Sequence, residues 1–119
     1  MSSLLSMNIH SLGDGQPDTP APGRLIEGEP RFTNWPLSGG PVATGVWAAT
    51  PGHHRMIRDR QTSEAFFILE GEVEIFEDGV ADARRFGPGD LVIIPPGFTG
   101  SWRSLSPVRK VYCTTQQPA

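Results

Sequence analysis

The stretch that decides the fold spans residues 52–71 and reads GHHRMIRDRQTSEAFFILEG. Its second half has the alternation of a strand, because Glu64, Phe66 and Ile68 share one face and the residues between them share the other. Both faces are largely apolar, so we expect this strand to lie between an interior and a second apolar surface. A second stretch, residues 89–100, reads GDLVIIPPGFTG and again sets a short apolar run between Gly and Pro turn residues.

Gly and Pro recur every several residues outward from these two stretches, and no segment between them supports an amphipathic helix of three turns. Evenly spaced short strands with turn signals predict an all-β sandwich or barrel. Residues 24–115 are therefore predicted to form a single β-barrel domain, with 1–23 as a flexible leader or an arm on a partner and 116–119 as a tail. The segments rich in β-branched and aromatic residues are 42–50, 54–60, 64–69, 72–77, 82–86, 91–94, 99–104 and 108–115.

Two turns can be typed from their residues. Asp78-Gly79 tolerates the positive φ angles of a tight turn and predicts a hairpin. Residues 61–63 predict a three-residue link, which would set Arg60 and Glu64 opposite each other on antiparallel strands. A cross-strand ion pair between Arg60 and Glu64 is then the plain structural interpretation of both residues.

Composition narrows the classes of partner. The chain has 119 residues and a net charge of -3 without any run of like charges, so no footprint for nucleic acid or an anionic membrane is expected. Cys113 stands alone, which excludes an intrachain disulfide and is compatible with a reducing compartment. No apolar stretch has the length of a membrane span, and residues 1–13 lack the features of a signal peptide. We expect a cytoplasmic protein whose partners are small molecules or protein.

Several motifs together resemble the cupin superfamily, and within it the small single-domain cupins related to the ureidoglycine aminohydrolase cupin domain, a subgroup mostly of unassigned function. The resemblance covers about residues 24–113, and it implies a double-stranded β-helix, or jelly-roll barrel, that commonly pairs into dimers. In metal-binding cupins two His, one Glu and a third His ligate the ion, and the matching positions here are Arg58, Arg60, Glu64 and Gly100. The motifs are TGVW (44–47), TPG (50–52), EAFFILEG (64–71), FGPGD (86–90), IPPGFTGSW (94–102) and VRKVY (108–112).

These positions predict a barrel without the usual metal, because a guanidinium has no lone pair for a metal and glycine has no side chain. We therefore expect no metal and no cofactor. A one-residue slip would instead turn Ile57 and Asp59 inward, and Asp59 with Glu64 could then hold a hard cation. His53 and His54 are adjacent and face opposite ways on a strand, so the one that points inward would be the first candidate ligand for a recruited metal. Otherwise both lie on the surface or rim.

The two arginines favour a small anion as ligand, since guanidinium groups match carboxylates in bidentate geometry. Arg58 has no obvious acidic partner, so either its head reaches solvent at the barrel mouth or an anion binds it there. The predicted ligand-binding set is Arg58, Arg60 and Glu64, with Trp102 and Phe66 keeping the site partly dry. The function predicted from this set is a non-catalytic module that binds a small carboxylate-like molecule.

Two alternatives remain open. The resemblance implies an enzyme of the ureidoglycine aminohydrolase type or a related hydrolase, lyase or isomerase. Lys110 and Tyr112 share a face of the last strand, where an amine and a phenol could serve acid-base chemistry, although an exposed Lys is the ordinary interpretation. The other alternative is a purely structural homodimer, which the outward apolar residues Ala65, Phe67 and Leu69 favour.

Overall fold

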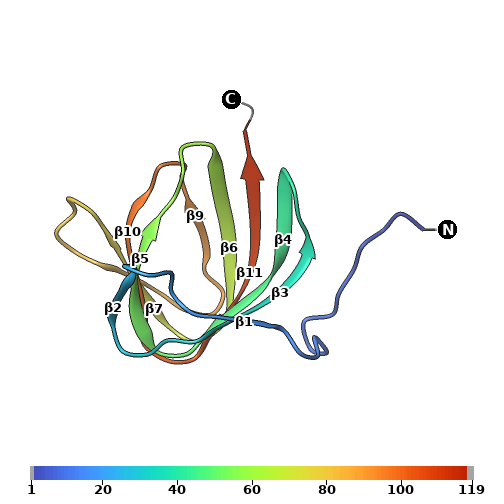
Figure 1. The fold of residues 1–119 in the computed structure, drawn as a ribbon, viewed down its shortest axis with the longest axis horizontal. Coiled ribbons are helices and arrows are strands. Elements are labelled where there is room, and N and C mark those ends of the chain that lie inside the picture. Colours follow the sequence, from blue (N-terminus) through green and yellow to red (C-terminus); the bar gives the residue numbers. More distant parts are fainter. Residues whose placement is uncertain (1, 118–119) are drawn as a thin grey trace.

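The computed structural model describes residues 2–117, in which eleven strands and no helix are found. The strands form two antiparallel sheets that face each other as a jelly-roll barrel (Figure 1), so the predicted all-β class is confirmed. One sheet has the order β1-β3-β4-β11-β6-β9 and the other has the order β2-β5-β10-β7-β8. The strands are β1 (Gln16–Asp18), β2 (Leu25–Glu27), β3 (Phe32–Ser38), β4 (Val42–Ala49), β5 (Gly52–Ile57), β6 (Thr62–Glu70), β7 (Val73–Glu77), β8 (Arg84–Phe86), β9 (Leu91–Ile94), β10 (Thr99–Ser104) and β11 (Val108–Gln116).

All eight strands expected from the sequence are present, and three more precede them. The missed strands β1, β2 and β3 are short or contain proline, and Pro36 interrupts the sequence pattern of β3 although this strand pairs with β4 along most of its length. Strand β1 lies within the segment expected to be a leader, and it pairs with β3. Of the expected tail, residues 118–119 lie outside the described residues.

The link between β5 and β6 differs from the expected hairpin. Strand β5 pairs with β2 and β10 in one sheet, whereas β6 pairs with β11 and β9 in the other, so residues 58–61 cross from sheet to sheet. The Asp59 carboxylate fixes this crossing, because it accepts hydrogen bonds from the backbone N–H of Gln61 at 2.8 Å and of Thr62 at 2.8 Å. The prediction of a three-residue hairpin that sets Arg60 opposite Glu64 was therefore wrong.

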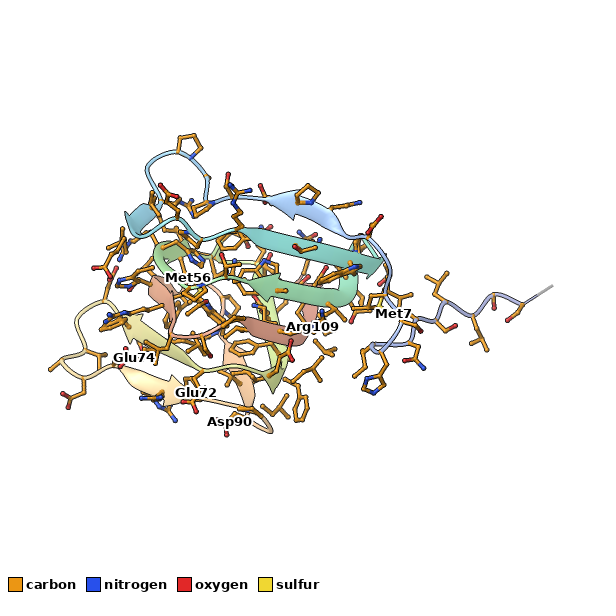
Figure 2. The ribbon with its side chains drawn as sticks, turned by 90° about the horizontal axis from the view of Figure 1, so that it is seen from below. Met7, Met56, Glu72, Glu74, Asp90 and Arg109 are labelled. Atoms are coloured by element: carbon orange, nitrogen blue, oxygen red, sulfur yellow. The ribbon has the colours of Figure 1, made fainter. Side chains whose placement is uncertain are left out.

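The core fills the space between the two sheets (Figure 2), where Met56 lies among apolar side chains from both. Strand β6 shows the expected alternation: Phe66 is 1% exposed on the inner face, and Phe67 is 41% exposed on the outer face. Next to Phe67, the edge strand β9 exposes Leu91 and Ile93. The second apolar surface expected beside this strand is therefore present, and it is exposed to solvent in the described part of the chain.

The N-terminal segment runs along one side of the barrel and then leads away from it (Figures 1 and 2). The indole N–H of Trp35 donates a hydrogen bond to the Gly13 carbonyl at 3.0 Å, which ties the segment to β3. None of the described residues belongs to a helix that could cross a bilayer.

Candidate ligand-binding site

A cavity of about 420 Å³ opens between the two sheets and is lined by side chains from both. We call it the barrel cavity. Three groups of residues form its wall. The five-stranded sheet and the link after β5 contribute His54, Arg55, Met56, Arg58 and Trp102; the six-stranded sheet contributes Phe32, Asn34, Trp47, Glu64, Lys110, Tyr112 and Thr114; and the N-terminal region contributes Asp18, Thr19, Pro20, Ala21 and Arg24.

Strand β5 and the link after it supply part of the wall of the barrel cavity. His54, Met56 and, just after the strand, Arg58 line it. Ile57 faces out and is 47% exposed. The Asp59 carboxylate accepts a hydrogen bond from the backbone N–H of Gln61 within the link. The slipped register, with Ile57 and Asp59 inward, is therefore wrong.

Glu64 lies at the centre of the charged part of the wall and is 5% exposed. Its Oε1 accepts a hydrogen bond from Arg58 Nη2 at 2.8 Å, and its Oε2 accepts one from Lys110 Nζ at 2.7 Å. Burial would by itself raise the pKa of the Glu64 carboxyl, but the attraction of Lys110 and Arg58 outweighs burial and leaves the pKa below its ordinary value. Glu64 is thus held as a carboxylate between two cations.

Lys110 is buried, with 6% of its surface exposed. Its Nζ lies 4.7 Å from the ring centroids of Trp47, Phe66 and Trp102, and we call these three rings the aromatic box. Burial lowers the pKa of the Lys110 ammonium, and the Glu64 carboxylate offsets only part of that effect. The ordinary interpretation of this residue as an exposed Lys was wrong.

His54 contributes a neutral imidazole to the cavity wall. Burial, followed by the positive charges of Lys110 and Arg58, lowers its pKa to about 4. Its Nδ1 is buried and has no hydrogen-bond partner among residues 2–117, and the same holds for Nε of Arg58. Two polar atoms of the wall are therefore left without a protein partner.

The structure brings together most, but not all, of the residues predicted to bind a ligand. Arg58, Glu64 and Trp102 line the barrel cavity, and Phe66 lies behind them as one side of the aromatic box. Arg60 lies outside, exposed on the link and beside Gly97. The predicted Arg60–Glu64 ion pair was wrong, because Arg58 and Lys110 occupy both oxygens of the carboxylate.

The other histidine faces away from the cavity. The His53 ring shares a hydrogen bond of 2.7 Å with the hydroxyl of Ser101 on the outer side of the five-stranded sheet. Sequence reasoning left open which of the two neighbouring histidines points inward, and the structure assigns that place to His54.

The residues at the usual cupin metal position do not fit a metal ion. A divalent cation would have to displace both Arg58 and Lys110 from Glu64, and a Cβ at Gly100 would collide with the carbonyl oxygen of Phe76. Within residues 2–117, no group of three or more His, Cys, Asp or Glu side chains could hold a metal.

Comparison with known proteins gives a family match and several similar folds. The family model described as the EutQ-like cupin domain matches residues 37–112. A protein of unknown function of the DUF861 family from Pseudomonas syringae pv. tomato is 26% identical with a TM-score of 0.73, over 87% of this chain and 45% of that one. A DUF861 family protein from Thermotoga maritima is 34% identical with a TM-score of 0.52, over 56% of this chain and 73% of that one.

The EutQ protein of Clostridium difficile is 18% identical with a TM-score of 0.63, over 73% of this chain and 64% of that one, a level of identity that shows the fold alone. The chain thus spans less than half of the Pseudomonas protein and somewhat under two thirds of the Clostridium one. No curated protein matches it.

Proposed function

The chain belongs to the EutQ-like cupin domain family, and we propose that it binds a small carboxylate-bearing anion in the barrel cavity, without the metal usual for cupins. The observation that carries the proposal is the pair of buried polar atoms without a protein partner, Nε of Arg58 and Nδ1 of His54. An unpartnered buried polar atom costs about 1–3 kcal/mol; a carboxylate oxygen can accept from the Nε–H of Arg58, and from His54 in the tautomer that carries the ring proton on Nδ1.

The charge of the wall supports an anion. Arg24, Arg58 and Lys110 face two carboxylates, Asp18 and Glu64, which leaves one positive charge. The guanidinium of Arg55, also in the wall, is already paired with Asp78. Because His54 is neutral at neutral pH, it adds a hydrogen-bonding group without adding charge. A ligand with one negative charge would balance the site.

The size and lining of the cavity favour a small molecule. A volume of about 420 Å³ lies at the lower end of the range for ligand pockets, which is roughly 300–1,000 Å³. The rings of Trp47 and Trp102 give part of the wall an apolar surface. Such a lining strengthens ionic contacts to a bound carboxylate, because it keeps the local dielectric constant low.

Thermal shift with a panel of mono- and dicarboxylates, including ureido acids, tests this proposal. At a ligand concentration of 100 times Kd, binding stabilises the fold by about 2.7 kcal/mol, so Tm should rise. The Arg58→Ala variant should lose the shift. Arg60→Ala is the matched control, because Arg60 lies on the same link outside the cavity, and it should keep the shift. The proposal fails if no carboxylate raises Tm, or if the two variants respond alike.

A second candidate function is an enzyme related to ureidoglycine aminohydrolase. The observation that favours it is the buried contact of 2.7 Å between Lys110 Nζ and Glu64 Oε2, since a proton can pass between an amine and a carboxylate at that distance. Release of ammonia from ureidoglycine, lost in Glu64→Gln, would support this function. A native protein that binds ureidoglycine but releases no ammonia would exclude it.

A further inference from the structure

Lys110 is the only lysine of the chain; the other nine residues among its ten Lys and Arg are arginines. An arginine stays protonated in a protein, whereas a buried lysine loses its proton more readily and can then act as a nucleophile. All other basic positions among the Lys and Arg residues of the chain are occupied by arginine. Its single ε-amine lies in the wall of the barrel cavity.

The surroundings of Lys110 combine a partner for its proton with an apolar environment. Glu64 Oε2 lies 2.7 Å from Nζ, and the three rings of the aromatic box surround the amine at 4.7 Å. A carboxylate at hydrogen-bond distance can take a proton from the ammonium and return it. Burial in apolar surroundings favours the neutral amine, and it is one of the known ways to activate a lysine as a nucleophile.

We propose that Nζ of Lys110 forms a covalent iminium with the carbonyl carbon of a small molecule, most favourably a 2-oxo acid. The oxo acid rests on the proposed function, because Arg58 and His54 would hold its carboxylate while its carbonyl carbon faces Lys110. The reactivity of the amine itself depends only on Lys110, Glu64 and the aromatic box.

The step balances with the groups present. Glu64 takes a proton from the ammonium, and the nitrogen lone pair forms a bond to the carbonyl carbon while the π electrons move to oxygen. Glu64 returns that proton to the oxygen and takes a second one from nitrogen. It then protonates the hydroxyl, which leaves as water as the C=N bond forms. One ammonium and one carbonyl group give one iminium and one water, and Glu64 ends as the carboxylate from which it began.

The same surroundings that hold the ammonium suit the product. An iminium nitrogen is also a cation, so the ion pair with Glu64 and the cation–π contacts with Trp47, Phe66 and Trp102 can persist after the reaction. No new charge is created in the interior, and the buried carboxylate keeps its partner.

Reductive trapping tests the proposal on the native chain. The protein is incubated with pyruvate and sodium cyanoborohydride, digested, and mapped by mass spectrometry. We expect a reduced pyruvyl adduct on Lys110, formed faster than on the α-amino group of the same chain. Lys110→Arg should lose this adduct, and Glu64→Gln should form it about 100-fold more slowly. Since Lys110 is the single lysine, mapping of the native chain locates the adduct even if Lys110→Arg does not fold.

Two further ligands separate this inference from the proposed function. Lactate carries the carboxylate of pyruvate with a hydroxyl in place of the carbonyl, and acetaldehyde carries a carbonyl without a carboxylate. If lactate raises Tm but pyruvate labels only the α-amino group, the inference is overturned and the proposed function stands. If acetaldehyde labels Lys110 while no carboxylate raises Tm, the iminium chemistry stands and the proposed function fails.

Discussion

Glu64 is the residue on which the interior charges depend. Its two oxygens bind Arg58 and Lys110, so its removal leaves a buried ammonium without a counterion. We expect Glu64→Ala to lower the free energy of unfolding by about 3–5 kcal/mol, the usual effect of breaking a buried ion pair. Urea denaturation measures this change.

Glu70→Ala is the matched control for that substitution. Glu70 is exposed at the end of the same strand and lies 3.6 Å from Arg109, so its loss should cost about 1 kcal/mol or less. Equal effects of the two substitutions would contradict the role given to Glu64.

His54 makes stability depend on pH in a defined window. The unfolded chain takes up a proton at this residue near pH 6.5, whereas the folded chain does so only near pH 4, because burial lowers the pKa to about 4. The stabilisation is full above pH 6.5 and is lost as the pH falls toward 4. The loss should be roughly 2 kcal/mol after allowance for partial solvent access.

Denaturation midpoints of native and His54→Gln proteins across this range measure the effect. His54→Gln should show a flatter pH dependence than the native protein. His10→Gln, a substitution at an exposed histidine of the N-terminal segment, should follow the native curve. A His54→Gln curve parallel to the native one would show that the imidazole is not held neutral.

The sequence predicted part of this residue-level arrangement. The spacing from Gly52 correctly placed Arg58 and Glu64 on the cavity wall, because strand alternation is a local property. It could not place Lys110 beside Glu64, since that contact joins residues 46 positions apart and depends on the pairing of β11 with β6. One sequence signal was available, namely that Lys110 is the only lysine of the chain.

At the scale of elements, strand existence was easier to predict than the connections between strands. Every strand from β4 onward was predicted, since turn residues flank each segment, although the expected segment 54–60 runs past the end of β5 at Ile57. The prediction of a hairpin after β5 was wrong, because a hairpin and a crossing between sheets have the same turn residues. The Asp59 side chain, which accepts from the backbone of Gln61 and Thr62, ends the regular strand before Arg60 can face inward.

The contact between β10 and β7 yields a prediction at this scale. A Cβ at Gly100 would collide with the carbonyl oxygen of Phe76, so Gly100→Ala should force the two strands apart and destabilise the fold by about 2 kcal/mol or more. Thermal or urea denaturation measures the loss. Gly39→Ala is the matched control, because a Cβ there meets nothing within 4 Å and should leave stability almost unchanged. Equal stability of the two variants would contradict the close approach.

At the scale of the whole molecule, the apolar surface of β6 and β9 is the feature that the fold leaves exposed to solvent. Phe67 lies opposite Leu91 in the ladder and Ala65 lies opposite Ile93, while β9 is an edge strand of its sheet. Leu91 is 71% exposed and Ile93 is 60% exposed. A second copy of the chain could cover this surface and the free edge together, so we expect a homodimer.

Light scattering at micromolar concentration tests that expectation with charged substitutions. Phe67→Arg should shift the native dimer to monomer, because the new charge would be buried in the interface. Ile57→Arg, which changes an exposed apolar residue on the other sheet, should leave the mass unchanged. A native protein that is already monomeric would contradict the prediction.

The aromatic box also gives the protein an optical property. The indoles of Trp47 and Trp102 lie 5.5 Å apart at 87°, and both face the barrel cavity, whereas Trp35, the third tryptophan of the chain, is tied to Gly13 outside it. Chromophores this close share their excited states, so circular dichroism and fluorescence of the pair should differ from those of two separate indoles. A molecule entering the cavity changes the dielectric surroundings of both rings at once, and the unlabelled protein thus carries its own spectroscopic reporter of occupancy.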